Sequence, residues 1–279
     1  MPELPEAETI VRGLRLSVVG RRIEGVQVVH ADVLRAPVRS FGAAARGRVI
    51  QGVGRRGKNV LLLLDEGRVL AVNLGMTGRL LPFSEPPRGA VRPTHPAVRL
   101  HFHGGGVLVF DDQRRFGTVE VLDASEWAER NTRMGPEPLE RGFTPARLFR
   151  DLQRSRSPLR SWLLDQRRIA GIGNIYAVEA LHLAGLHPLR PANRVEPDEA
   201  RRLHGAIRRV LRAAIRHGGT TIRDYRNAEG GEGAYAPRLL VYGRDGQPCV
   251  RCGTAVDRVV LSNRSAFFCP VCQPASGGA

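Results

Sequence analysis

The spacing of four cysteines near the end of the chain most restricts what this sequence can fold into. They form two Cys-x2-Cys motifs, Cys249 with Cys252 and Cys269 with Cys272, and sixteen residues separate the two motifs. Such spacing lets two knuckles place four thiolates tetrahedrally around one zinc ion. Two disulfides are the alternative, which a reducing compartment disfavours. The sequence therefore predicts one structural zinc, because four thiolates leave no coordination position open for chemistry.

The residues between the two knuckles predict a β-hairpin. Residues 258–261 and 266–269 are typical of its two strands, and residues 262–265 of its turn. Arg264 is therefore expected at the tip of a rigid finger.

The net charge indicates the class of partner. The chain carries 43 Lys and Arg against 27 Asp and Glu, a formal net charge of +16. Nucleic acid is the leading polyanion, and a generally basic protein without such a partner is the alternative. No lipidation motif, basic amphipathic segment, long apolar run or leading signal peptide is evident, so we expect no membrane partner. We expect a cytoplasmic, nucleoid-associated protein.

Lys58 is the only lysine among these basic residues. An arginine guanidinium stays protonated, whereas a desolvated lysine amine can lose and regain a proton. The lone lysine therefore indicates proton transfer at position 58. The alternative is an accident of an arginine-rich composition.

Hydrophobic periodicity divides the chain into a β-rich part and a helical part. A helix is predicted over residues 6–18, and short strands follow up to about residue 130. These strands predict a β-sandwich or barrel and include residues 26–28, 60–64, 69–72, 98–102 and 107–110. A linker rich in glycine and proline covers residues 132–145. Helices are then predicted around residues 148–163, 175–184 and 203–214.

Six motifs together resemble the bacterial formamidopyrimidine-DNA glycosylase family. They are Met-Pro-Glu-Leu-Pro-Glu at 1–6, Arg-Gly-Lys at 56–58, Leu-Gly-Met-Thr-Gly at 74–78, Arg-Arg-Phe-Gly at 114–117, Gly-Ile-Gly-Asn-Ile-Tyr at 171–176 and the cysteine ribbon. The resemblance covers nearly the whole chain. It implies an α+β fold with a β-sandwich and leading helix (1–131), a linker (132–145), a helix-two-turns-helix DNA-binding domain (146–238) and a zinc finger (239–275).

The resemblance also implies an activity. The family consists of base-excision repair enzymes that remove oxidised purines, such as 8-oxoguanine and formamidopyrimidines, from double-stranded DNA. They then cleave the abasic strand by β,δ-elimination. We therefore expect a monomeric DNA glycosylase and abasic-site lyase.

Four residues match the catalytic positions of that family. Removal of Met1 would give Pro2 a free secondary amine with a pKa of about 8, able to attack a sugar carbon and form an iminium. Glu3 would be a general acid, and the alternative is a carboxylate that merely favours a helix N-terminus. By resemblance, Lys58 contacts phosphate and transfers protons, and Arg264 grips phosphates beside the lesion and assists the second elimination.

Other matching positions imply contacts with DNA. A base that leaves the stack leaves a void, which by resemblance Met76, Arg114 and Phe116 would fill. An apolar residue in a β-rich domain is otherwise more often part of the core. The resemblance assigns phosphate contacts to His95, Asn174 and Tyr242. Residues 218–235 resemble the loop that caps the flipped purine.

Two departures and two rival functions stay open. Asn263 replaces a glycine that is usual in the family, and we expect the turn to survive because asparagine tolerates left-handed backbone geometry. Ser155 lies where some relatives have a DNA-contacting lysine.

An endonuclease VIII-like enzyme for oxidised pyrimidines is one rival function, and Leu4 together with the trio of Met76, Arg114 and Phe116 argues against it. The other is a non-catalytic zinc-ribbon DNA-binding protein, disfavoured because all four catalytic positions match.

Overall fold

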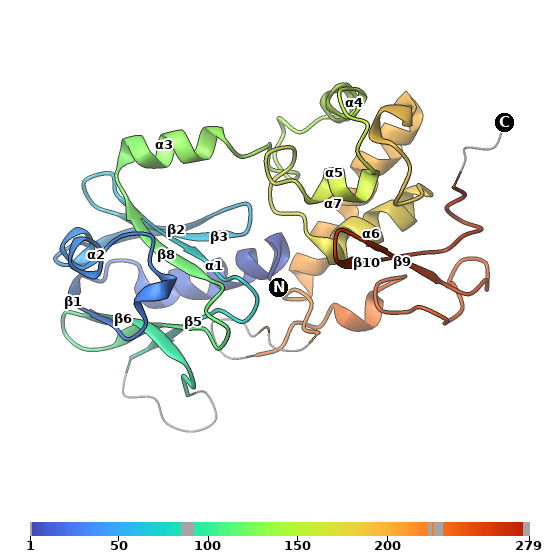
Figure 1. Ribbon diagram of the computed structural model, residues 1–279. Coiled ribbons are helices and arrows are strands. Elements are labelled where there is room, and N and C mark those ends of the chain that lie inside the picture. Colours follow the sequence, from blue (N-terminus) through green and yellow to red (C-terminus); the bar gives the residue numbers. More distant parts are fainter. Residues whose placement is uncertain (1, 85–91, 223–224, 226–230, 276–279) are drawn as a thin grey trace. The chain divides into compact units, whose positions relative to one another are not determined.

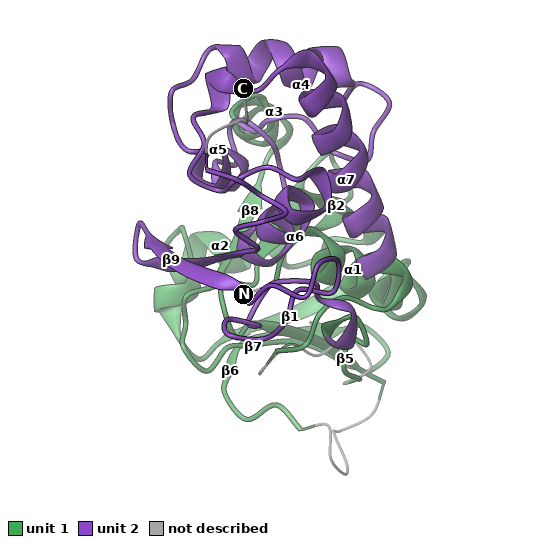
Figure 2. Cartoon of the chain, turned by 90° about the vertical axis from the view of Figure 1, so that its right-hand side faces the viewer, with its two compact units in different colours: residues 1–133, 215–236 green, residues 134–214, 237–279 purple. Residues whose placement is uncertain are grey.

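The computed structural model describes residues 2–84, 92–222, 225 and 231–275. The chain divides into two compact units, coloured separately in Figure 2. Unit 1 comprises residues 1–133 and 215–236, and unit 2 comprises residues 134–214 and 237–279. Among the helices within the described ranges, none combines the length and hydropathy needed to cross a bilayer.

Unit 1 begins with helix α1, Leu4–Val18 (Figure 1). A capping box between Glu3 and Glu6 starts the helix, and the backbone N–H of Glu3 donates to Glu6 Oε2 at 2.8 Å. The helix begins two residues before the predicted start, because Pro5 is compatible with a first turn whose N–H groups have no partner within the helix. Its buried apolar stripe consists of Leu4, Ala7, Ile10, Val11, Leu14 and Val18.

Two four-stranded antiparallel sheets complete this part of the fold. The first has the order β1-β6-β7-β5, formed by Ile23–Val28 (β1), Pro96–Phe102 (β6), Val107–Asp111 (β7) and Arg79–Phe83 (β5). The second has the order β2-β3-β4-β8, formed by Ile50–Arg56 (β2), Asn59–Leu64 (β3), Val69–Asn73 (β4) and Thr118–Leu122 (β8). Buried residues of both sheets and of α1 form one core cluster. The predicted β-sandwich with a leading helix is therefore confirmed.

Two short helices of unit 1 were not predicted. Helix α2, Val38–Ala45, follows a 3-10 turn at Ala31–Val33 (η1) and buries Phe41 in the core. Helix α3, Ala124–Thr132, covers the outer face of the second sheet, where its Trp127 packs against a small apolar cluster. Its last residue lies inside the stretch that composition indicated as linker.

The segment 215–236 clusters with unit 1, although it lies within the predicted helical domain 146–238. The backbone N–H of Thr220 donates to Glu6 Oε1 at 2.7 Å, which connects this segment to α1. Tyr225 joins the core of unit 1, and its hydroxyl donates to the carbonyl of Gly218 at 3.1 Å. Local periodicity cannot indicate contacts between residues this far apart in the chain.

Unit 2 contains the predicted helices. They are Pro145–Gln153 (α4), Leu159–Leu164 (α5), Asn174–Ala184 (α6) and Pro197–Arg216 (α7), whose last two residues belong to unit 1. A 3-10 turn lies at Ala192–Arg194 (η2), and another at Ala236–Arg238 (η3) begins with the last residue of unit 1. Helix α6 ends at Gly185, which has a φ of 72° as the left-handed C-terminal position requires.

The hairpin of the zinc ribbon is formed by β9, Asp257–Leu261, and β10, Arg264–Phe268. The predicted four-residue turn is wrong, because Ser262 and Asn263 alone connect the strands, with φ of 49° and 58°. A two-residue turn with positive φ at both positions is type I′, whose twist matches that of the strands. The expected left-handed geometry at Asn263 is confirmed. Arg264 is the first residue of β10, opposite Leu261.

Candidate active site and metal centre

Pro2 and Glu3 precede the first residue of α1, and both are buried. Met1 lies outside the described residues. Glu3 is 2% exposed and is the N-cap of α1, where it forms the capping box. The alternative role considered for Glu3 is therefore present in the structure, and its role as a general acid stays a prediction.

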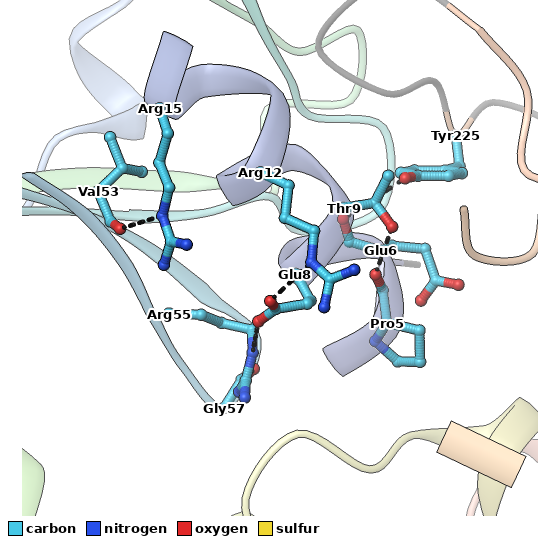
Figure 3. A network of polar contacts seen from close by, with 10 residues as sticks. All are labelled: Pro5, Glu6, Glu8, Thr9, Arg12, Arg15, Val53, Arg55, Gly57 and Tyr225. Carbon is cyan, nitrogen blue, oxygen red and sulfur yellow. Dashed lines mark hydrogen bonds and ion pairs between the residues drawn. The ribbon is translucent and has the colours of Figure 1, made fainter. Parts of the chain in front are cut away.

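Lys58 lies at the tip of the β2–β3 hairpin, in a two-residue turn with Gly57. Gly57 has a φ of +57°, which suits the first central position of a type II′ turn. Arg55 Nη1 donates to the carbonyl of Gly57 at 2.9 Å, and Arg55 Nε donates to Glu8 Oε2 at 3.2 Å (Figure 3). The lysine turn is thereby connected to helix α1.

Glu8 is charged at neutral pH. Burial raises its pKa, but hydrogen bonds and charges from Arg12 and Arg55 outweigh this effect and lower the pKa below its usual value. Arg12 Nε donates to Glu8 Oε1 at 3.1 Å, so each carboxylate oxygen receives one guanidinium (Figure 3). The connection between α1 and β2 is therefore an ion pair.

The three predicted void-filling residues lie on the surface of unit 1. Met76, in the turn after β4, is 39% exposed, and Phe116, in the turn after β7, is 58% exposed. The guanidinium carbon of Arg114 lies over the Phe116 ring, 4.7 Å from its centroid. None of the three is part of the core, so the core alternative is excluded.

Buried polar groups connect the two turns that carry these side chains. Thr77 Oγ1 donates to Asp112 Oδ1 and accepts the backbone N–H of Arg114 at 3.0 Å. The backbone N–H of Gly117 donates to Asp112 Oδ2 at 2.8 Å. A Cβ on Gly75 would lie 2.4 Å from the nitrogen of Gly117, so this approach requires glycine. The structure therefore brings together the two turns that carry the three predicted void-filling residues.

His95 is exposed just before β6, on a segment that a buried carboxylate holds. The backbone N–H of His95 donates to Asp111 Oδ1 at 2.6 Å. Asp111 is 1% exposed and forms an ion pair with Arg79. Sequence reasoning missed Asp111 and Asp112, although two consecutive aspartates at the end of an apolar strand were a usable signal.

In unit 2, the side chain of Asn174 connects α6 to the zinc hairpin. Arg160 donates to Asn174 Oδ1 from Nε at 3.0 Å and from Nη2 at 2.7 Å, and donates from Nη1 to the carbonyl of Leu261 at 2.9 Å. Asn174 Nδ2 donates to the carbonyl of Ser265 at 2.9 Å. Burial, and then the charge of exposed Arg264, lowers the pKa of Arg160. Asn174, on α6, therefore contacts the hairpin at Ser265, next to Arg264.

Sequence reasoning missed Arg160, which is 1% exposed. In a chain this rich in arginine, no local signal separates a buried guanidinium from a solvated one.

Tyr242 packs partly into the zinc finger rather than standing free on its surface. Its ring makes an edge contact with Phe267 at 5.2 Å between centroids. Fully buried Glu179 accepts the backbone N–H groups of Leu240, Val241 and Tyr242 at 2.9, 3.0 and 2.9 Å. Burial raises the pKa of Glu179, although these three hydrogen bonds oppose the shift. The phosphate contact of Tyr242 stays a prediction.

The four cysteines form a cluster whose geometry fits zinc. Their sulfur atoms all lie within 4.8 Å of one another. The closest pairs are Cys252 and Cys269 at 3.4 Å, Cys252 and Cys272 at 3.5 Å, and Cys249 and Cys272 at 4.0 Å. Tetrahedral zinc with Zn–S bonds of about 2.3 Å places its sulfurs about 3.8 Å apart. No two of these cysteines form a disulfide, so the cluster is a site for one structural zinc.

Family models match nearly the full length of this architecture. Residues 1–119 match the formamidopyrimidine-DNA glycosylase N-terminal domain, residues 134–226 match the formamidopyrimidine-DNA glycosylase H2TH domain, and residues 246–275 match a zinc finger found in FPG and IleRS. The chain belongs to the formamidopyrimidine-DNA glycosylase family. The sandwich, the helices and the zinc ribbon are thus the three parts typical of a formamidopyrimidine-DNA glycosylase.

Individual members of the formamidopyrimidine-DNA glycosylase family are similar over their whole length. The enzyme of Chloroflexus aggregans is 46% identical over 274 residues, 98% of each chain, and that of Streptococcus pneumoniae is 39% identical over 275 residues, 98% of this chain and 99% of that one. The crystal structure of the MutM (Fpg) protein from Thermus thermophilus matches with a TM-score of 0.87 and 42% identity, covering 99% of this chain and 100% of that one. A Lactococcus lactis Fpg variant in complex with Fapy-dG-containing DNA matches with a TM-score of 0.89 and 32% identity, covering 98% and 100%.

Proposed function

We propose that this chain is a base-excision repair enzyme that removes oxidised purines from duplex DNA and then cleaves the abasic strand. The observation that carries the proposal is the exposed group of Met76, Arg114 and Phe116, presented by two interlocked turns. Apolar side chains exposed on turns that hydrogen bonds hold in place suit a surface that enters a base stack. Relatives crystallised with Fapy-dG-containing and abasic-site-containing DNA support the same substrate class.

The first step is excision of the base. The secondary amine of Pro2, free after removal of Met1, attacks C1′ of the damaged nucleotide. A C1′–N bond forms as the glycosidic bond breaks, and the departing base takes up a proton. The Pro2 nitrogen then loses its proton, and its electron pair forms the C1′=N double bond as the C1′–O4′ bond of the sugar ring breaks and Glu3 supplies a proton to O4′. Lys58 donates or accepts protons beside the flanking phosphate. The resulting iminium is an electron sink.

Strand cleavage follows from that iminium. Loss of a proton from C2′ breaks the bond from C3′ to the phosphate oxygen, which is the β-elimination. In the second elimination, a proton is lost from C4′ and the bond from C5′ to its phosphate oxygen breaks. Arg264, exposed at the start of β10, assists this second step by holding the phosphates beside the lesion.

Recognition of duplex DNA uses side chains of both units. Met76 and Phe116 occupy the space of the extruded base, and Arg114 hydrogen-bonds the base that has lost its partner. His95, Asn174 and Tyr242 contact phosphates. The segment 218–235 caps the extruded purine, although residues 223–224 and 226–230 lie outside the described residues. We expect a monomer acting on nucleoid DNA in the cytoplasm.

Borohydride trapping tests enzyme class and nucleophile together. An oligonucleotide duplex with 8-oxoguanine opposite cytosine should give a covalent protein–DNA adduct, because borohydride reduces the iminium to a stable amine. The same duplex with guanine is the matched control and should give none. A protein that keeps Met1 or carries an N-terminal tag should not be trapped. Full cutting activity by such a protein would contradict the proline mechanism.

A further inference from the structure

Two asparagines connect the turn of Lys58 with the turn of Met76. Asn59 begins β3 and Asn73 ends β4, and the two are paired in the sheet. Asn73 Nδ2 donates to Asn59 Oδ1 at 3.0 Å. The side chains of neighbouring strands thus join directly at one end of the sheet.

Each asparagine uses the rest of its amide on one of the two turns. Asn59 Nδ2 donates to the carbonyl of Arg56 at 3.1 Å, at the start of the turn that carries Lys58. Asn73 Oδ1 accepts the backbone N–H of Gly75 at 3.0 Å, immediately before Met76. Three hydrogen bonds therefore run in one direction, from the N–H of Gly75 to the carbonyl of Arg56. Amides arranged in this way polarise and strengthen one another.

The sheet itself does not require these residue types. Asparagine is depleted in β-strands, where β-branched and aromatic residues pack better. The backbone register of β3 and β4 is set by the ladder that extends from Asn59 with Asn73 to Leu63 with Val69. The two amide side chains are partly buried and add contacts to turns rather than to the core.

We propose that Asn59 and Asn73 are positioning residues that hold the Lys58 turn and the Met76 turn at a set separation. The proposal rests on the proposed function, in which Lys58 transfers a proton and Met76 fills the void of the extruded base. Beyond Met76, a second set of hydrogen bonds begins at Thr77, which is bonded to Asp112 and to the backbone of Arg114. The two sets are joined covalently through residues 75–77, so together they link proton transfer with void filling, where misplacement by about 1 Å can slow catalysis by about 100-fold.

The first test measures structure without activity. In Asn59→Ala, amide hydrogen exchange in a peptide covering residues 74–78 should rise by about threefold or more, although the hydrogen bonds of the Asn59 side chain go to Arg56 and Asn73. Asn59→Asp keeps the acceptor for Asn73 and loses the donor to Arg56, so it should loosen the Lys58 turn with less effect at residues 74–78. Gln51→Ala, an exposed amide on β2, is the matched control and should change neither. Unchanged exchange at residues 74–78 in Asn59→Ala overturns the proposal.

The second test is a double-mutant cycle on single-turnover excision of 8-oxoguanine. Asn59→Ala and Met76→Ala should be coupled, so that their combined rate loss departs from the product of the single losses by about threefold or more. In an Asn73→Ala background this coupling should vanish, because Asn73 is the connection between them. Multiplicative losses in both backgrounds overturn the proposal.

The two proposals fail in different ways. A wild-type protein that cuts no 8-oxoguanine duplex contradicts the proposed function, whereas the exchange test still decides whether the two turns are connected. If Asn59→Ala does not fold, both tests are run with Asn59→Thr, a β-branched residue that suits a strand and lacks the amide.

Discussion

Arg55 on β2 donates to Glu8 on α1 at 3.2 Å, and the same guanidinium holds the carbonyl of Gly57 at 2.9 Å (Figure 3). The turn that carries Lys58 is therefore attached to the helix preceded by Pro2 and Glu3. Because Arg55 and Glu8 hold this turn, we expect a substitution at position 58 to change the charged group of the side chain and to leave the backbone in place.

Lys58→Arg should separate charge from proton transfer. The positive charge remains, so affinity for lesion DNA should be largely kept, whereas excision of 8-oxoguanine should slow by about 10- to 100-fold because guanidinium does not release its proton. Single-turnover rates with DNA affinity measured in parallel check this. Equal excision rates for the variant and the wild type would mean that the unique lysine has no role in proton transfer.

Removal of one zinc ligand should loosen the hairpin that carries Arg264. Metal analysis should give one zinc per chain in the wild type. In Cys269→Ser, zinc content should fall and affinity for lesion duplex should drop by about tenfold or more, since metal binding and folding of such a site are coupled. Val271→Ala changes an exposed residue of the same knuckle and should change neither quantity. Full activity after chelation with proven loss of zinc would exclude a structural need for the metal.

Arg160→Ala should destabilise unit 2. The change leaves the amide oxygen of Asn174 and the carbonyl of Leu261 without this donor, so we expect a loss of about 2 to 4 kcal/mol in the free energy of unfolding. Arg167→Ala is the matched control, because its side chain is 80% exposed and its effect should stay within about 0.5 kcal/mol. Chemical denaturation measures both. Equal midpoints for the two variants would contradict the role assigned to Arg160.

The opposite base should decide the rate through Arg114. Two donors of its guanidinium can meet the acceptor edge of cytosine, whereas adenine presents a donor there and leaves one N–H unpaired at a cost of about 1 to 3 kcal/mol. Excision opposite cytosine should therefore be at least about tenfold faster than opposite adenine. Single-turnover rates on the two duplexes and on a thymine-glycol duplex measure this. A preference for thymine glycol would favour the endonuclease VIII-like alternative.

Several features of the fold could be predicted because their causes are local. The apolar spacing of α1, the alternation in β6 and the heptad-like spacing of α7 each follow from which face of an element is buried. Helix α3 was missed because it buries none of its residues fully, so its periodicity is weak. The ribbon turn was placed correctly but made too long, since polar composition does not distinguish two turn residues from four.

By itself the sequence determined the zinc ligands and the order of motifs that shows the family. It also determined the two changes of hydrophobic period, from the leading helix to the strands and from the strands to the later helices. These depend on spacing along the chain, which is visible before folding. Only the tertiary structure decided that Arg160 holds Asn174, that Glu179 accepts three backbone N–H groups and that Asn59 meets Asn73. A hydrogen bond needs donor and acceptor about 3 Å apart, and which distant polar groups reach that separation is set by packing of the whole core.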